Sequence, residues 1–443
     1  QEFLIAFVGP LMSAVLSGLF FGIYYLSGAG ESSLAAVVFW LGFINALLAA
    51  FNMLPGFPLD GGRVFRSVIW GLTGSRTRST RYAARVGPLV GAGIAGLGVA
   101  SLGHAHPGLA TALAEQARTL LHTSNLYFHP LQGQVGRRLT ALSGLPRAFF
   151  CNSGTEAVEG CLKFARRYWH TRGETARTRI VALERSFHGR TFGALSVTWE
   201  PGYRAPFEPL LEGVVFVSPT DPDALNTAVG SDVAAIILEP IQGEGGVWPL
   251  SPEFADAVTA ACERTGTLLI ADETQCGLGR TGAPFYSATL GLRPDLMALG
   301  KALGAGVPIG AILMSQEVAD GISPGDHGTT YGGNLLACRA ALVYLDALEH
   351  GGLDRVRVAG ARLADGLRAL ATRHPVITDI RGAGLMRGLE MPADIAAQVV
   401  KGALARRLLV NRTAGGDFYC DAGAGGDAHC PEIDLPVAVP RNT

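Results

Sequence analysis

Two long apolar stretches without a charged side chain open the chain, at residues 4–26 and 34–54. Each has about 20 residues or more, the length that a helix needs to cross the hydrocarbon core of a bilayer. The pattern therefore predicts two transmembrane helices and membrane attachment through residues 4–54. Two buried core helices are the alternative that the same pattern permits.

From about residue 104 the pattern changes to short apolar runs that alternate with helical segments such as 156–170 and 252–265. Runs rich in Val, Ile and Leu between helices are typical of a mostly parallel sheet with helices on both faces. In such α/β sheets ligands bind beyond the carboxyl ends of the strands. The predicted strands are 148–151, 179–183, 213–217, 234–238, 267–271, 295–298 and 309–314.

The charge balance bears on partners and location. Lys and Arg total 36 and Asp and Glu total 37, so the two charges nearly cancel. Net charge therefore provides no general attraction to nucleic acid, and no nucleic-acid partner is predicted. A basic loop beside membrane spans usually faces the cytoplasm, which predicts a membrane-embedded N-terminal segment and a cytoplasmic catalytic region. The arginines of this loop are Arg63, Arg66, Arg76, Arg78, Arg81 and Arg85.

Two turns of small and hydroxyl residues are candidate anion sites. In Asn-Ser-Gly-Thr-Glu, residues 152–156, backbone amides at a helix N-terminus can approach an anion. The alternative there is an ordinary helix cap made by Ser153 or Thr155. The second turn, at residues 327–334, offers Thr329 and Thr330 together with several glycine amides.

Four further residues carry candidate chemistry. Asp272 ends an apolar strand, where a carboxylate is costly unless it meets a cation such as a protonated pyridine nitrogen; a capping Asp is the alternative. Lys301 lies in an apolar run, where lost hydration favours a neutral, nucleophilic amine unless the side chain reaches the surface. Phe187 offers an aromatic face, with the guanidinium of Arg190 three residues further on.

With these motifs in order, residues 99–415 resemble the class III aminotransferases of fold type I, most closely the acetylornithine aminotransferase branch. The resemblance implies a large domain that binds pyridoxal 5′-phosphate (PLP) at 96–346, a partial small α+β domain at 347–415, and an unassigned tail at 416–443. The matching stretches are LGHAHP (102–107), FFCNSGTEA (149–157), SFHGRT (186–191), ILEPIQGEGG (237–246), ADETQCGLGRTG (271–282), ALGKALGAGVPIGA (298–311) and HGTTYGGN (327–334).

The resemblance implies roles around the cofactor. Lys301 would hold PLP as a Schiff base and then move a proton between substrate and cofactor. Asp272 would pair with the pyridine nitrogen, Gln275 would contact the ring hydroxyl, and Phe187 would stack on the ring.

It also implies how phosphate and substrates are bound. Gly154 and Thr155 would bind the phosphate, joined by Thr330 from the partner subunit of a homodimer. The residues implied for substrate binding are Arg190 and Thr329 for an acylated amino acid, and Glu244 as a switch between amino donor and 2-oxoglutarate.

The implied activity is a ping-pong transamination between an N-acylated diamino acid, similar to N2-acetylornithine, and 2-oxoglutarate, as in arginine biosynthesis. The chain departs from the family pattern at both ends. The N-terminal arm is replaced by the apolar segment, and the C-terminal Arg that clamps the substrate carboxylate has no match. An ω-aminotransferase of the ornithine or 4-aminobutyrate type is one alternative. An inactive chimera that carries a membrane metalloprotease remnant is another.

The metalloprotease alternative rests on residues 52–63, NMLPGFPLDGGR. Over residues 1–95 the chain resembles the site-2 protease family of intramembrane zinc proteases, in which Asp60 would match a zinc ligand. The His-Glu-x-x-His helix that supplies two ligands and the general base has no match in the sequence. Asp60 is therefore interpreted as an orphan match, and no metal site is predicted.

Overall fold

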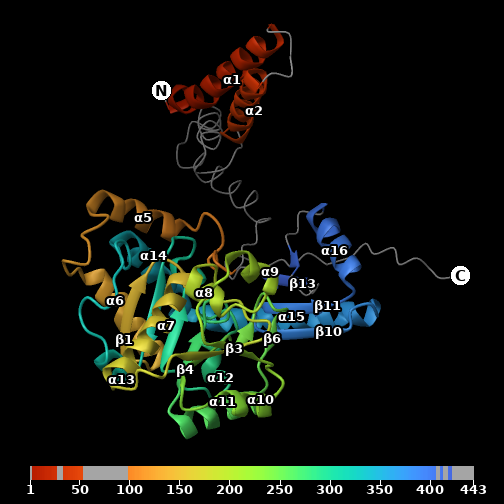
Figure 1. Cartoon of the computed structure of the whole chain (residues 1–443). Helices are drawn as coiled ribbons and strands as arrows, with labels where there is room; N and C mark the ends of the chain where they lie inside the picture. The colour runs from red at the N-terminus through yellow and green to blue at the C-terminus, as the bar shows by residue number, and fades with distance from the viewer. Residues whose placement is uncertain (1, 27–32, 53–97, 406–409, 413–417, 422–443) are drawn as a thin grey trace, which may run out of the picture. The chain divides into compact units, whose positions relative to one another are not determined.

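The computed structural model describes residues 2–26, 33–52, 98–405, 410–412 and 418–421 (Figure 1). The chain divides into two compact units, Gln1–Ile94 and Ala95–Thr443. Asp60 and the arginine-rich loop lie outside the described residues.

The first unit contains two packed helices, α1 (Glu2–Leu26) and α2 (Ser33–Asn52). The hydroxyl of Ser17 donates to the carbonyl of Gly42 at 2.9 Å, and the ring of Phe21 packs edge-on against that of Phe39. A side chain at Gly42 would meet the Phe21 ring at 3.1 Å, so a small residue permits this approach. The uncharged stretches therefore do form helices.

Among the residues that the structure describes, no helix has both the length and the hydropathy that crossing a bilayer requires. The prediction of transmembrane helices is therefore not confirmed.

The second unit is built on a seven-stranded sheet with the order β1-β9-β8-β7-β4-β2-β3. The prediction of a mostly parallel sheet is confirmed with one refinement, because β9 runs antiparallel to both of its neighbours. All seven predicted strands are present. They are β1 (Arg147–Cys151), β2 (Arg179–Leu183), β3 (Val214–Val217), β4 (Val233–Leu238), β7 (Leu268–Asp272), β8 (Leu296–Leu299) and β9 (Gly310–Met314).

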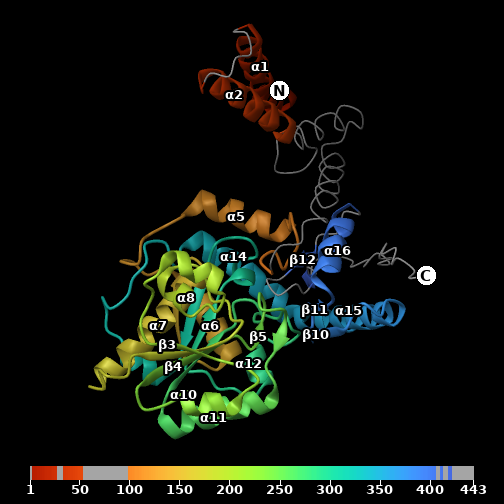
Figure 2. The ribbon, with the colours of Figure 1, turned by 45° about the vertical axis from the view of Figure 1, so that its right-hand side comes forward.

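Helices cover both faces of this sheet because its central strands are apolar on both sides (Figures 1 and 2). Successive residues of a strand point to opposite faces. Ile237 of β4 therefore packs in the cluster beneath α7 (Gly154–Thr171), whereas Ile236 packs in the cluster with α10 (Pro222–Ala228) and α11 (Pro252–Thr265). On the same face as the Ile236 cluster, α6 (Pro130–Ser143) and α14 (Leu335–Ala347) share a further apolar core with β8 and β9.

A second sheet of four antiparallel strands, in the order β10-β11-β13-β12, forms towards the C-terminus. Residues 418–421, which the sequence left within the unassigned tail, pair with β11 as strand β13 and so extend this sheet. Its elements are α15 (Leu353–Arg373), β10 (Asp379–Ala383), β11 (Met386–Glu390), α16 (Ala393–Ala405), β12 (Asn411–Arg412) and β13 (Phe418–Asp421). They enclose an apolar core of their own.

The remaining described elements are short connections, apart from α5. They are α5 (Pro107–Thr119), α8 (Phe192–Ser196), α9 (Pro201–Arg204), η1 (Ala205–Phe207), β5 (Ile241–Gln242), β6 (Trp248–Pro249), α12 (Tyr286–Thr289), η2 (Lys301–Gly304), α13 (Gln316–Asp320) and η3 (Leu348–Gly352).

Candidate active site

The candidate residues gather where the strands of the large sheet end. The strands β2, β4, β7 and β8 are mutually parallel, and β1 runs in the same direction because both β1 and β8 are antiparallel to β9. Their carboxyl ends therefore share one edge. Asn152 follows β1, Asp272 ends β7, and Lys301 lies two residues beyond β8. This is the edge at which the strand pattern predicted a ligand site.

Lys301 begins η2 in a strained backbone conformation. Its φ is 39°, in the left-handed region, which costs a residue other than glycine about 1–3 kcal/mol. The ammonium Nζ donates to Oε1 of the buried Gln275 at 2.8 Å. Gly300 packs so closely that a Cβ there would lie 2.9 Å from the backbone nitrogen of Gly154. The alternative of a lysine reaching for the surface is therefore wrong.

Asp272 is buried, with 4% of its surface exposed. Its Oδ1 accepts the backbone N–H of Thr274 at 3.0 Å, and its Oδ2 lies 2.8 Å from Nδ1 of His188. The His188 side chain is fully buried, and its Nε2 has no hydrogen-bond partner among the described residues. One carboxylate oxygen thus caps the local turn at Thr274. The other oxygen bonds to His188, which is distant in the sequence.

At the first turn of α7 the capping interpretation is confirmed for Ser153. Its Oγ accepts the backbone N–H of Glu156 at 3.3 Å, and Glu156 in turn accepts the N–H of Asn152 at 3.0 Å. Gly154, the first residue of α7, has no room for a side chain, because a Cβ would lie 2.5 Å from Cγ2 of Thr274. The positive end of the helix dipole therefore faces the same edge without side-chain cover at Gly154.

Thr155 follows in the same turn. Its hydroxyl lies 3.0 Å from that of Thr191, in the segment after Arg190. A Cβ at Gly189 would lie 2.2 Å from the Thr155 Oγ1, so this approach also depends on glycine. The segment that follows β2 thus packs against the N-terminus of α7.

Phe187 and Arg190 meet an aromatic residue that the sequence analysis did not name. The Arg190 guanidinium carbon lies 3.5 Å from the ring centroid of Tyr203 and 5.5 Å from that of Phe187. The two rings are 6.4 Å apart and nearly perpendicular. Stacking on Tyr203 orients the exposed guanidinium and leaves its N–H edge available.

The turn at 327–334 reaches the segment between β1 and α7 through Thr329. The Thr329 hydroxyl accepts Nδ2 of Asn152 at 3.1 Å, and its carbonyl accepts Nδ2 of Asn125 at 2.9 Å. Thr330 is exposed in the same turn, and Glu244 is half-buried between β5 and β6. The structure therefore places Thr329 at the candidate site of its own chain. Among the described residues, it shows no hydrogen bond between the Thr330 side chain and this site.

Three further residues of the site, His188, Tyr203 and Glu239, were not predicted from the sequence. His188 lies within the SFHGRT stretch, between the two residues that were named, but its partner Asp272 is 84 residues away. Glu239 follows β4, and only 4% of its surface is exposed. A single carboxylate next to an apolar run does not show in the sequence that it is buried. The place of Glu239 in the ILEPIQGEGG stretch, just past a strand end, is the signal that could have found it.

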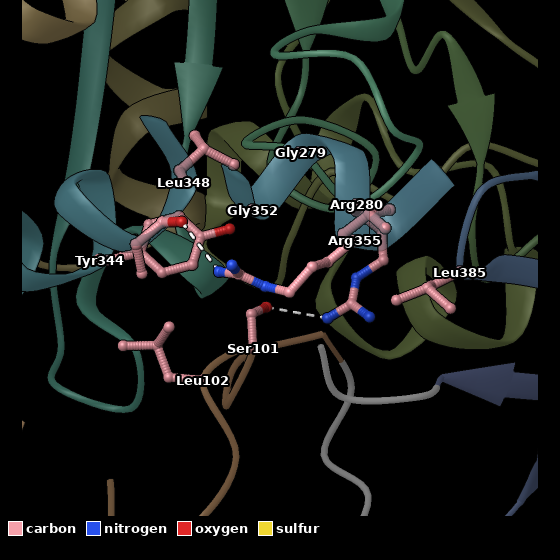
Figure 3. Close-up of a pocket in the computed structure, with 11 residues that line it drawn as sticks. Ser101, Leu102, Gly279, Arg280, Tyr344, Leu348, Gly352, Arg355 and Leu385 are labelled. Carbon is pink, nitrogen blue, oxygen red and sulfur yellow. Dashed lines mark hydrogen bonds between the residues drawn. The ribbon is translucent and has the colours of Figure 1, made fainter. Parts of the chain in front are cut away.

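A separate cavity lies away from these residues (Figure 3). It is lined by Ser101, Arg280, Tyr344, Arg355 and Leu385, among others, and contains none of the predicted site residues. The buried Arg280 donates from Nη2 to the Ser101 hydroxyl at 2.8 Å. This bond ties the segment before α5 to the turn that follows β7.

Comparison with known proteins confirms both resemblances. The family described as Aminotransferase class-III matches residues 87–416, and Peptidase family M50 matches residues 27–94. The two family matches overlap at residues 87–94. The boundary between the two compact units falls at the end of this overlap, between Ile94 and Ala95.

Curated relatives cover most of the second unit. An acetylornithine aminotransferase of Gloeobacter violaceus is 46% identical over 319 residues, which are 72% of this chain and 80% of that protein. One from Methanocaldococcus jannaschii is 43% identical over 324 residues, 72% of this chain and 81% of that protein.

Solved structures are similar as well. The ornithine aminotransferase of Toxoplasma gondii superposes with a TM-score of 0.71 at 34% identity, covering 74% of this chain and 80% of that one. An amine transaminase with bound PLP, from an uncultivated Pseudomonas species, gives a TM-score of 0.69 at 32% identity, covering 75% and 85%. The chain therefore belongs to the class-III aminotransferases, PLP-dependent enzymes that transfer amino groups between amino acids and keto acids.

Proposed function

We propose that this protein transfers the amino group of an N-acylated diamino acid, of the N2-acetylornithine type, to 2-oxoglutarate, with PLP held at Lys301. The observation that carries the proposal is Lys301 itself, strained and bonded to Gln275 at the edge where Asp272 is buried. The choice of donor is supported by the 46% identity to an acetylornithine aminotransferase, against 34% to an ornithine aminotransferase.

The residues present fit PLP. Gly154 and Gly300 leave a surface of bare backbone, and the N-terminus of α7 favours the phosphate group together with Thr155. Phe187 supplies an aromatic face for a ring. A cofactor of this kind needs a buried carboxylate for its ring nitrogen, and Asp272 is the candidate.

Each of the chain's own groups would have a separate role in the proposed amino-group transfer. When bound, PLP supplies an aldehyde that reacts with amines and a ring that accepts electrons from the substrate carbon. The Lys301 amine would take the proton from that carbon and pass it to the cofactor, while Oε1 of Gln275 holds the amine in place. Asp272, oriented by His188, keeps a proton on the ring nitrogen. The same groups act in reverse order on 2-oxoglutarate, which makes the cycle ping-pong.

For the substrate, we assign acyl-group and carboxylate recognition to Arg190 and Thr329, with Glu244 as the switch between donor and acceptor. Arg190 has planar donors, and its stack on Tyr203 limits its rotamers. N2-acetylornithine is therefore expected to give a kcat/KM at least about tenfold above that of free ornithine, which is a difference of about 1.4 kcal/mol.

Glutamate formation from 2-oxoglutarate, measured with each donor at the same enzyme concentration, checks this expectation. A higher kcat/KM for ornithine or 4-aminobutyrate would favour the ω-aminotransferase alternative. Absence of activity with every donor, in a chain that still binds PLP, would favour the inactive chimera.

A homodimer is part of the proposal. Asn125 ties the segment 120–128 to the turn of Thr329 and Thr330, through the carbonyls of Thr329 and Gly332. Large apolar side chains are exposed along both, an arrangement that marks a protein interface. They are Leu120, Leu121, Leu126, Tyr127, Phe128 and Tyr331. We infer that a second copy of the chain covers them, and that Thr330 completes the phosphate site of the partner.

Phe128→Asp is expected to convert the dimer to a monomer and to weaken PLP retention, because a charge would enter the centre of this apolar surface. Light scattering after size exclusion measures the mass, and the absorbance of the eluted protein measures bound cofactor. Val358→Asp is the matched control, since Val358 is also an exposed apolar residue, on α15. A dimeric, PLP-loaded Phe128→Asp protein would contradict the proposed interface.

The domains are proposed as an N-terminal fragment at 1–95, a large domain at 96–346 and a small domain at 347–415, and β13 is added to the small domain.

Membrane attachment through residues 4–54 and a cytoplasmic catalytic region stay predictions.

A further inference from the structure

Glu239 is a buried carboxyl group just beyond the end of β4. Its Oε2 accepts the backbone N–H of Phe187 at 3.0 Å, and its Oε1 accepts the backbone N–H of Gly243 at 3.3 Å. One side chain therefore holds two separate segments of the candidate active site. The mechanism proposed above assigns it no role.

Each of these segments leads directly to a residue proposed to contact the cofactor. Phe187 is the proposed stacking residue, and the next residue, His188, bonds to Asp272. Gly243 lies against the Gln275 side chain so closely that a Cβ there would be 2.2 Å from Oε1, the same atom that accepts Nζ of Lys301. Glu239 therefore bonds to the segments that carry the aromatic face, the partner of the buried acid and the neighbour of the residue that accepts the lysine amine.

Burial, together with the charges around Glu239, brings the protonation change of this carboxyl close to neutral pH. Burial raises the pKa of Glu239 to about 7, the negative charge of Asp272 also raises it, and His188 and the two N–H groups lower it. His188 faces it from the segment after β2, Asp272 from the end of β7, and the Cys276 thiol from the turn beyond. As pH rises through 7, a negative charge appears beside a buried imidazole.

We propose that Glu239 is a positioning residue whose protonation state controls, through His188 and Asp272, how strongly the ring nitrogen of the cofactor holds its proton. The proposal rests on the cofactor site proposed above. In its ionised form Glu239 accepts the Phe187 and Gly243 N–H groups more strongly, and its negative charge acts on the His188 imidazole that bonds to Asp272. In its neutral form both effects weaken, so the site changes its electrostatics without a change of fold.

The test is a pH titration of the PLP absorbance of the holoenzyme between pH 5.5 and 8.5. Wild-type protein is expected to show a spectral step with a midpoint near pH 7, and Glu239→Gln is expected to lack it, because the amide does not ionise. The pH profile of kcat/KM should lose the same step. A Glu239→Gln holoenzyme with an unchanged step would overturn the proposal.

Thermal stability supplies a readout that does not depend on activity. A folded-state pKa near 7, above the ordinary 4.5, means that the native state binds the proton more tightly than the unfolded chain. The stabilising effect is complete below 4.5 and is lost as pH rises to about 7. Wild-type Tm minus that of Glu239→Gln should therefore fall across this window, and a constant difference would count against the proposal.

Glu273→Gln is the matched control. Glu273 is another fully buried carboxyl, but it accepts the N–H of Ser287 and contacts Cys276 rather than Phe187. This variant is expected to lower Tm and to keep the spectral step. If Glu239→Gln does not fold, Glu239→Asp retains the ionisable group with a shorter reach, so its step must persist at a shifted pH; an unshifted step overturns the proposal.

A wild-type protein that takes up no PLP would instead refute the proposed cofactor site. That result is distinguishable, because it appears before any variant is compared.

Discussion

Lys301→Ala is expected to lose covalent PLP attachment and to reduce kcat by about 10²- to 10⁴-fold, the usual contribution of a positioned acid–base group. The Lys301 amine is proposed both to anchor the cofactor and to move the substrate proton, so no second residue takes over. Borohydride reduction of the holoenzyme followed by peptide mass spectrometry locates the attached pyridoxyl group, and single-turnover absorbance measures the rate.

The chain makes this experiment unambiguous because it contains only three lysines, at 163, 301 and 401. Lys401→Ala is the matched control, since Lys401 is an exposed residue of α16. It should label and turn over like the wild type. A pyridoxyl group on Lys163 or Lys401, or a Lys301→Ala protein with normal turnover, would refute the assignment.

Asp272→Asn is expected to bind PLP and to lose about 10²- to 10³-fold in kcat, the range seen when one preorganised electrostatic group is removed. The amide keeps the shape of the carboxylate but not its charge, so the ring nitrogen would no longer hold its proton and the ring would become a weaker electron acceptor. Rapid-mixing absorbance of the holoenzyme with donor alone measures this half-reaction.

Asp295→Asn controls for the loss of a half-buried carboxylate at a strand end. Asp295 precedes β8 at the opposite edge of the same sheet, where it accepts the backbone N–H of Leu269 at 2.8 Å, and burial raises its pKa. This variant should lower Tm while the half-reaction stays at the wild-type rate. Equal rates for Asp272→Asn and wild type would remove Asp272 from the mechanism.

The sheet shows how far the pattern of apolar residues could be followed. All seven strands were predicted to within about one residue at each end, because a strand buried on both faces must be apolar throughout and its ends are where polarity returns. The direction of β9 was not predicted. Gly310–Met314 is as apolar as the parallel strands of the sheet, and only its antiparallel pairing with β1 and β8 shows that it runs the other way.

The same limit applies at the C-terminus. Strand β13 has a short, mixed sequence that follows a glycine pair, and nothing local distinguishes it from the rest of the tail. Its place beside β11 comes from the hydrogen-bonding edge that β11 offers.

The residues proposed to carry the chemistry could be chosen from the sequence, because Lys301, Asp272 and Gly154 stand at strand and helix ends inside specific motifs. What keeps them in position could not. The His188–Asp272 pair spans 84 residues, and Glu239 joins backbone groups from two different turns. Local sequence encodes which side chain occupies a strand end, whereas only the packed sheet decides which strand ends become neighbours.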